Sequence, residues 1–411
     1  VSFKFRVRKF MKLFKSLLIA PATLGLLAPM SATANELNLA EVSGYSSSEE
    51  VQNISEFYPQ ELAVTNSRVD GLEARINEFE AGSFSETTTA SFSADFYLGT
   101  VDGGTTATND PVQATYGFQI DLNTSFTGED SLDISLDGGN TITGAAGTLS
   151  VVEFDGNATG DNLVVDGVSY TFPLGGATAF VADNGDASAL FTTACTYGGP
   201  TNTLDDCGNV NAGPTSGGVA AGASYDFGNG FTVAGGYQST NGQEVLGIMT
   251  EESLDTYAFN AAYVADNYGV SITYSAIEDG VLATSKEDTY TAFNGYFSPE
   301  GEGLPSVSLG WELGDDADPT TNAVPLGADL DQITSFFLGL QWDEMGPGSF
   351  GVAMGHSNTR EESDEEYMYE AYYSYPVNDG MTVTPVVFTK ESAVAGQDDS
   401  TGFMVKTSFS F

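Results

Sequence analysis

Hydrophobic and polar residues alternate with a period of two over most of the chain after Phe84. Residues two apart lie on one face of a β-strand, so each alternating segment predicts a strand with one apolar and one polar face. The pattern predicts sixteen strands, at 88–100, 113–126, 130–138, 165–173, 176–183, 218–227, 230–239, 255–264, 268–277, 288–298, 304–313, 333–342, 348–356, 365–376, 380–390 and 401–411.

The segment 401–411 shows the pattern clearly. Its polar face carries Met404, Lys406, Ser408 and Ser410, and its other face is apolar apart from one threonine. A strand of about ten residues that is apolar outside and polar inside is what a membrane-spanning β-barrel requires. We interpret the aromatic residues of its apolar face near the end, Phe409 and Phe411, as an assembly signal for the outer-membrane insertion machinery.

The connections between these strands fall into two classes. Alternate connections are tight turns, at 127–129, 174–175, 228–229, 265–267, 299–303, 343–347 and 377–379, whereas the opposite set includes long polar loops at 139–164, 184–217, 240–254 and 314–332. Short periplasmic turns and long outer loops are typical of outer-membrane barrels. A secreted acidic β-sandwich would also alternate, but it would not sort its loops in this way.

The first 34 residues have the features of an export signal. Lys12 and Lys15 follow Met11, a broken apolar stretch comes next, and small residues precede Asn35. We expect cleavage after Ala34, with residues 1–10 an irrelevant extension or a wrongly assigned start. Residues 35–60 then form a short polar periplasmic segment.

Residues 61–82 change to a helical period, with apolar residues at heptad spacing. The segment is shorter than three heptads, and a lone helix of that length is marginal in water. We expect a helix that either forms a coiled coil between subunits or packs on its own barrel, which would occupy 84–411.

Charge narrows the range of partners. Six of the twelve basic residues precede Asn35, so six remain against 57 acidic residues, a net charge of −51. Nucleic acid is therefore excluded as a partner. The scarcity of lysine and arginine suits a lipid-facing surface, where each costs about 2–4 kcal/mol at the midplane.

Several segments together resemble one family. They are RVDGLEAR at 68–75, FSETT at 84–88, LNTSFTG at 122–128, YTFPLG at 170–175 and YPVNDGMTVTP at 375–385. In this order they resemble cyanobacterial outer-membrane porins of the OprB-like, carbohydrate-selective class. The resemblance implies a porin that assembles as a homotrimer. Its usual S-layer-homology domain is missing or vestigial here, because only about 25 residues are available for it.

The alternation also identifies side chains that point into the barrel. A sixteen-stranded barrel holds a water-filled channel unless loops plug it, and rings of acidic side chains favour cations. The alternative is that these acids are solvated lumen residues above a narrower constriction. The inward residues are Asp95, Asp121, Asp133, Asp137, Asp226, Asn260, Ser271, Thr273, Glu370 and Lys406.

Both cysteines of the chain, Cys195 and Cys207, lie in the loop at 184–217. An oxidising compartment and a thirteen-residue ring favour a disulfide over a zinc site, which would need two more ligands. In porins of this type the third outer loop often enters the lumen. The bond would therefore stiffen a constriction, or else staple a surface loop.

Other chemistry has little support. His356 is the only histidine and lacks a nucleophile partner, which argues against an enzyme. The acidic runs at 315–318 and 361–366 lack calcium-loop spacing, and no glycine-rich motif precedes a helix, so we expect no metal and no cofactor. The sequence predicts a passive porin for small hydrophilic solutes and cations in outer-membrane lipid. The alternative is a closed-barrel receptor or adhesin that uses its long acidic loops.

Overall fold

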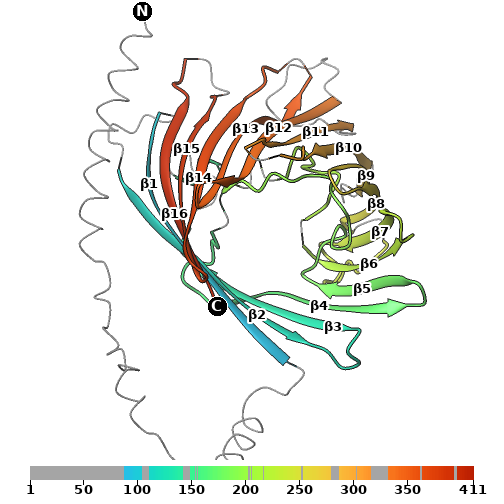
Figure 1. Ribbon diagram of the computed structural model, residues 1–411. Coiled ribbons are helices and arrows are strands. Elements are labelled where there is room, and N and C mark those ends of the chain that lie inside the picture. Colours follow the sequence, from blue (N-terminus) through green and yellow to red (C-terminus); the bar gives the residue numbers. More distant parts are fainter. Residues whose placement is uncertain are drawn as a thin grey trace, which may run out of the picture. The chain divides into compact units, whose positions relative to one another are not determined.

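The computed structural model describes the part of the chain from residue 88 to residue 411, with gaps (Figure 1). The predicted signal peptide (1–34), the polar segment (35–60) and the predicted helix (61–82) lie outside the described residues. The gaps within the described part are 104–110, 142–148, 153, 155, 202–203, 205, 216, 251–252, 279–286, 302, 316–331, 362 and 393–395.

Within the residues that the structure describes, sixteen strands make up almost all of the regular structure, together with one short 3₁₀ helix, η2 (Leu149–Val152). The strands are β1 (Thr88–Asp102), β2 (Gln113–Thr124), β3 (Ser131–Gly139), β4 (Val164–Leu174), β5 (Ala177–Asp183), β6 (Val219–Asp226), β7 (Phe231–Ser239), β8 (Asp255–Val264), β9 (Tyr268–Glu278), β10 (Glu287–Phe297), β11 (Ser306–Asp315), β12 (Gln332–Met345), β13 (Gly348–Arg360), β14 (Met368–Asn378), β15 (Met381–Lys390) and β16 (Ser400–Ser410).

Each strand pairs with its sequence neighbours in antiparallel fashion, and β1 also pairs with β16, which closes the sheet into a barrel (Figure 1). Just beyond this last ladder, the N–H of Phe411 donates to the carbonyl oxygen of Phe92 at 3.0 Å, and the N–H of Phe92 donates back at 2.9 Å. Their rings stack with centroids 5.6 Å apart. The predicted sixteen-stranded antiparallel barrel is confirmed.

Most strand bounds lie within a few residues of the predicted ones, and the β12–β13 hairpin departs furthest. The sequence predicts a loop at 343–347, but the ladder continues through a register shift after Trp342 until Met345 pairs with Gly348. Gly346 adopts a left-handed φ of +68° in the resulting tight turn. The hairpin therefore runs to its tip as a two-residue turn.

The two ends of the barrel carry different connections. One end, which we call the turn end, has the short connections 125–130, 175–176, 227–230, 265–267, 298–305, 346–347 and 379–380. The other end, the loop end, has the connections 103–112, 140–163, 184–218, 240–254, 279–286, 316–331, 361–367 and 391–399, which include every connection longer than about eight residues. This sorting follows the parity expected from the sequence.

The outer face of the barrel is apolar. Phe96, Phe259, Val270 and Trp311 each expose about half or more of their surface there, among the described residues. Such a band matches the lipid-facing surface of a membrane barrel. In the described part of the chain, no helix is long and apolar enough to span a membrane.

Candidate functional site

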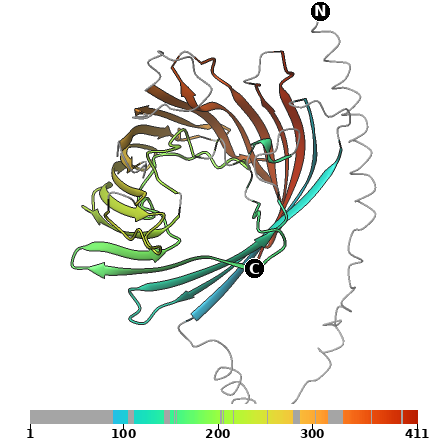
Figure 2. The same ribbon diagram turned by 180° about the vertical axis from the view of Figure 1, so that it is seen from behind.

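Two of the long connections turn into the barrel. Loop 2 (140–163) joins β3 to β4, and loop 3 (184–218) joins β5 to β6. Side chains from both loops form a single buried cluster with residues of β1 and β12–β16, and chain segments are visible inside the ring of strands from either side (Figures 1 and 2). This cluster identifies the inward face of those strands.

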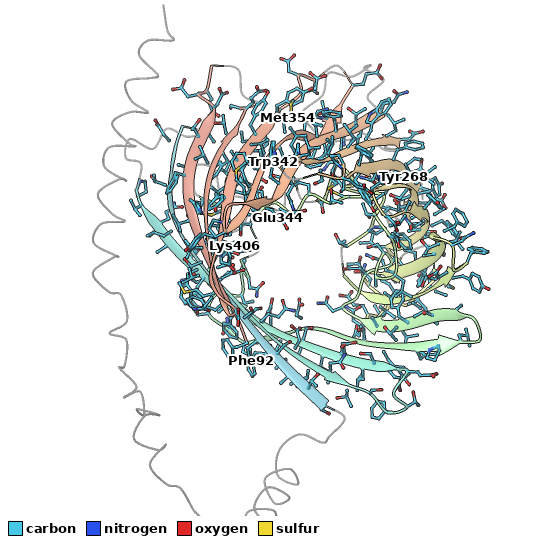
Figure 3. All side chains as sticks on the ribbon, viewed as in Figure 1. Phe92, Tyr268, Trp342, Glu344, Met354 and Lys406 are labelled. Atoms are coloured by element: carbon cyan, nitrogen blue, oxygen red, sulfur yellow. A yellow bond between two sulfur atoms is a disulfide. The ribbon has the colours of Figure 1, made fainter. Side chains whose placement is uncertain are left out.

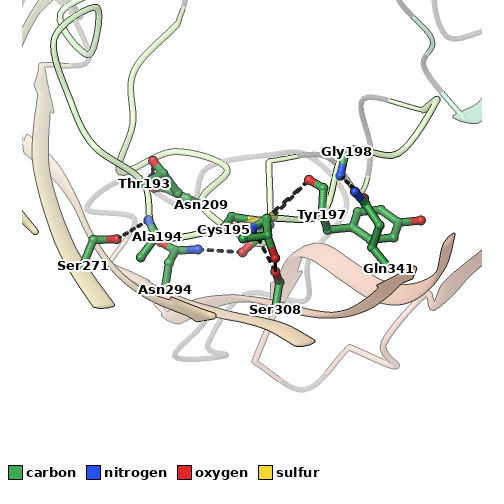
Figure 4. Close-up of a disulfide and its surroundings, with 12 residues drawn as sticks. Thr193, Ala194, Cys195, Tyr197, Gly198, Asn209, Ser271, Asn294, Ser308 and Gln341 are labelled. Atoms are coloured by element: carbon green, nitrogen blue, oxygen red, sulfur yellow. Dashed lines mark hydrogen bonds between the residues drawn. A yellow bond between two sulfur atoms is a disulfide. The ribbon is translucent and has the colours of Figure 1, made fainter. Parts of the chain in front are cut away.

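Residues 192–198 of loop 3 run across the strands as a strap. Alternate backbone N–H groups of an extended segment point to one side, and here they point to the wall. Each donates to a side-chain oxygen on a different strand: Thr192 to Asn260 of β8 at 3.1 Å, Ala194 to Ser271 of β9 at 2.9 Å, Thr196 to Ser308 of β11 at 3.0 Å, and Gly198 to Gln341 of β12 at 2.9 Å. The bonds of Ala194 and Gly198 are drawn in Figure 4.

These four hydrogen bonds satisfy backbone N–H groups that the strap buries against the wall. A backbone N–H removed from water needs an acceptor, and the strands of a closed barrel have no free edge to supply one. Inward side chains with carbonyl or hydroxyl oxygens supply it instead. The polar residues of β8, β9, β11 and β12 therefore fix the path of loop 3.

The two cysteines of loop 3 form a disulfide, with Cα atoms 6.4 Å apart. The ring that they close lies against the wall: Asn294 of β10 donates to the carbonyl oxygen of Cys207 at 2.7 Å (Figure 4). Within the ring, the hydroxyls of Tyr197 and Thr201 donate to the two carboxylate oxygens of Glu370 at 2.5 and 2.6 Å.

Two glycines let the loop backbone touch the wall. A Cβ atom on Gly310 of β11 would lie 1.6 Å from the carbonyl oxygen of Cys207, and one on Gly236 of β7 would lie 1.8 Å from that of Ala187. Neither contact is compatible with any side chain. Glycine at these two inward positions is therefore required by the seated loop.

Loop 2 covers a different part of the wall. Leu149, Val152 and Phe154 are buried there, and the Phe154 ring lies 4.3 Å from that of Tyr97 on β1. The backbone of the segment is held at Leu149, whose N–H donates to Gln113 Oε1 at 2.7 Å. Apolar packing between loop and wall thus fills one part of the lumen.

The second holding point of loop 2 is a lysine. Lys390 of β15 donates from Nζ to the carbonyl oxygen of Val151 at 3.3 Å. The sequence interpretation assigned an inward base only at Lys406, so Lys390 is a second inward base. Its ammonium group is engaged by loop backbone at the loop end.

The inward face of β2 and β3 stays accessible to solvent. Asp121 accepts hydrogen bonds from Gln119 and Ser135 at 2.8 and 2.7 Å. Asp133 accepts from Asn123 and Ser131 at 2.5 and 2.6 Å. We call Asp121, Asp133 and Asp137 the acidic strip; all three are only partly buried.

Asp95 of β1 differs from the acidic strip because it has a counter-ion. Lys406 Nζ lies 3.1 Å from Asp95 Oδ2 and 5.6 Å from the centre of the Tyr97 ring. The Lys406 and Asp95 side chains are 17% and 24% exposed, so both still meet solvent. Lys406 is labelled in Figure 3, where its strand lies beside β1. The Asp95–Lys406 ion pair therefore has no net charge.

Four residues expected to line open water are instead covered by loop 3 or by their neighbours. Asn260, Ser271 and Glu370 are each less than 8% exposed because they bind loop 3. Thr273 is fully buried and accepts a hydrogen bond from Asn260 at 2.8 Å. All four side chains lie inward; Asn260, Ser271 and Glu370 bind loop 3, and Thr273 binds Asn260.

The remaining candidate residues lie near the ends of strands. Asp226 is exposed at the turn end, where it accepts from the N–H of Gly228 at 2.7 Å. Phe409 faces outward and packs edge-on against Phe96 at 6.0 Å. His356 packs between aromatic rings, with centroids 6.3 Å from Phe336 and 5.2 Å from Tyr367.

Two carboxylates outside the strands have shifted pKa values. The Tyr170 hydroxyl, with further donors from Thr127 and Ser125, lowers the pKa of Asp130 in the β2–β3 turn. Burial raises the pKa of Asp186 in loop 3, and the N–H of Gly217 opposes that rise. Asp130 thus organises a turn as a charged group, whereas the charge of Asp186 is disfavoured by its surroundings.

Several residues that hold loop 3 were not predicted from the sequence. Asn260, Ser271 and Glu370 were predicted, but as pore-lining residues. Gln238, Ser308, Glu312 and Gln341 all lie inward and all accept N–H groups of the loop. The inward glycines were the available signal, because a glycine on the face that a wide barrel fills with side chains indicates close approach of another backbone.

Comparisons with known proteins agree with this geometry. The solved structure of OprB from Pseudomonas putida superposes with a TM-score of 0.59 at 13% identity, covering 79% of this chain and 94% of that one. An anion-selective porin from Comamonas acidovorans gives 0.55 at 13%, covering 79% and 99%, and a mutant porin of Rh. blastica gives 0.51 at 12%, covering 79% and 100%. This chain has the porin fold.

Sequence comparison adds one relative. An uncharacterized protein, alr4550, of Nostoc sp. is 25% identical over 421 residues, which span 88% of this chain and 72% of the relative. No protein-family model matches the chain.

Proposed function

We propose that this protein is an outer-membrane porin, a passive channel for small hydrophilic solutes, carbohydrates and ions that prefers cations. The observation that carries the proposal is the acidic strip, a solvent-accessible inward face in a closed sixteen-stranded barrel with an apolar exterior. Charged and polar side chains on an inner wall are what a hydrophilic pathway needs. The similar solved structures are of porins.

The cation preference rests on the charges of the inner wall. The acidic strip carries three carboxylates, whereas the lysines of β15 and β16 are paired with Asp95 or with loop backbone. An anion-selective porin shares the fold, so selectivity follows from side chains and not from the barrel. Export by a cleaved signal peptide and assembly as a homotrimer belong to the same proposal.

Planar-bilayer recording tests the proposal. We expect purified, folded protein to give stable conductance steps, and a KCl gradient to give a reversal potential of the sign for cations. A folded protein that stays silent at all voltages would contradict the porin.

A second candidate is a closed-barrel receptor or adhesin. One observation favours it: bulky side chains fill part of the lumen, where Tyr97, Phe337, Phe388 and Met404 pack with loops 2 and 3 in one buried cluster. The same recording separates the two functions, because a receptor that is closed by its loops conducts only after loop 3 is displaced.

A further inference from the structure

Strand β11 contacts loop 3 at three successive inward positions. Ser308 accepts from the N–H of Thr196, Gly310 lies under the carbonyl of Cys207, and Glu312 binds Asn211 and Ala212. Thr196 lies within the disulfide ring, whereas Asn211 and Ala212 follow Cys207 in the sequence. The segment 209–213, which we call the return limb, therefore reaches β11 at the last of the three positions, and Asn211 also contacts Ser275 of β9 and Asn358 of β13.

Glu312 receives the return limb entirely through N–H groups. Its Oε2 accepts the backbone N–H of Asn211 at 2.7 Å and that of Ala212 at 2.8 Å, while its Oε1 accepts Asn211 Nδ2 at 2.8 Å. Its side chain is 1% exposed. Within the described part of the chain no ion pair to Glu312 is formed, so neutral N–H donors alone compensate the buried carboxylate.

Glu370, the other buried glutamate that binds loop 3, has a different kind of donor. Its partners are the hydroxyls of Tyr197 and Thr201, and a hydroxyl can turn to accept as well as donate. An N–H group can only donate. A glutamine could therefore replace Glu370 with its hydrogen bonds rearranged. A glutamine at position 312 would keep its oxygen on the two backbone N–H groups, and its NH₂ would then face the Asn211 amide, which can turn over only by giving up its bond to Asn358 Oδ1.

We propose that Glu312 is the positioning residue for the return limb of loop 3. A carboxylate suits this position because two of its partners are backbone N–H groups, which can only donate, and the third is the Asn211 amide NH₂, which also donates to Asn358 Oδ1 at 2.6 Å. The proposal deepens the porin function, since loop 3 occupies the lumen and its seating sets the space left for solutes. Hydrogen bonds to a charged group are about twice as strong as neutral ones, so this contact outweighs the single N–H bonds of the strap.

Amide hydrogen exchange followed by mass spectrometry tests the proposal in the folded barrel. For Glu312→Gln we expect exchange in the peptide covering 209–213 to rise about tenfold, because neutral hydrogen bonds then replace charge-assisted ones at the N–H groups of Asn211 and Ala212. The matched control is Glu370→Gln, which we expect to leave exchange at 209–213 unchanged. Unchanged exchange in Glu312→Gln, or an equal rise in the control, would overturn the proposal.

A second variant covers failure of Glu312→Gln to fold. Asn211→Ala removes one donor from the loop side and leaves the wall intact, and we expect a smaller rise confined to the return limb; no rise would overturn the proposal. The exchange measurement needs no channel activity. A silent wild type with the expected exchange pattern would therefore refute the porin and leave the role of Glu312 standing.

Discussion

The carbonyl oxygen of Cys207 occupies the position that a Cβ atom on Gly310 would need, at a separation of 1.6 Å. A Cβ atom at position 310 can be accommodated only if the loop backbone moves away from the strand. Gly310→Ala should therefore displace the disulfide ring from β11, at a cost of about 1–3 kcal/mol typical of overpacking. We expect the barrel to assemble and its single-channel conductance to change or become noisier.

Gly295→Ala is the matched control for that substitution. Gly295 lies on the neighbouring strand β10, and the nearest atom to its Cβ position is 3.4 Å away. We expect wild-type conductance from this variant. Equal behaviour of the two alanine variants would contradict a seated loop.

The disulfide restrains the part of loop 3 that carries the Glu370 contacts. Closing a ring of this size is worth about 3 kcal/mol by chain entropy. We expect mass spectrometry to show that reduction adds two hydrogen atoms, and Cys195→Ser with Cys207→Ser to increase current noise while the barrel stays heat-modifiable. If the double variant conducts as the wild type does, the wall contacts alone hold the ring.

The acidic strip predicts the direction of selectivity changes. Asp121→Asn, Asp133→Asn and Asp137→Asn together should lower the cation preference measured by reversal potential. Lys406→Met should raise it, because Asp95 then loses its counter-ion. Both effects should weaken as salt rises, since screening acts over about 8–10 Å at physiological ionic strength.

An anion-selective wild type would refute the role of the strip. It would direct attention to Lys390 and Lys406, the inward lysines of β15 and β16. Lys390→Met would then identify whether the base beside loop 2 is responsible.

Phe411 completes the pairing of β1 with β16 through two backbone hydrogen bonds and a stacked ring. Loss of the aromatic pair should cost about 0.5–1.5 kcal/mol beyond the lost area. We expect Phe411→Ala to lower the folded, heat-modifiable fraction in outer membranes. Phe297→Ala, at another exposed aromatic on the turn end, is the control, and an equal yield from both variants would remove Phe411 as an assembly signal.

The β2–β3 turn should respond to acid. The folded pKa of Asp130 is lowered, so its carboxylate stabilises the turn above its ordinary pKa and loses this effect as the pH falls through the lowered value. Asp130→Asn should reduce the unfolding temperature at neutral pH and flatten its dependence on acid. Glu129→Gln, an exposed neighbour, should change neither quantity.

The strands could be predicted from the sequence because their cause is local. Lipid on one side and water or loop on the other impose a period of two on each strand, and segments such as 401–411 show it directly. The alternation of short turns and long loops along the chain then indicates an up-and-down barrel. The predicted strand ends were wrong at the β12–β13 hairpin. The residues after Trp342 suit a loop as well as they suit a strand with a register shift, so the sequence does not distinguish the two.

The division of the inner wall could not be predicted in the same way. Asn260 and Asp133 both point inward from their own strands, yet the first is buried and the second is partly exposed. The difference lies in contacts between distant parts of the chain, such as Thr192 with Asn260. Local alternation carries no information about which wall a loop will choose.

The strap has a consequence for the order in which the molecule can be built. Loop 3 precedes β6 in the chain, yet its contacts reach Gln341 on β12 and Glu370 on β14. These acceptors lie 143 and 173 residues further along the chain. Loop 3 can therefore be fully seated only in a barrel that includes β12 and β14, and an incomplete barrel that lacks those strands cannot be narrowed by this loop in the same way.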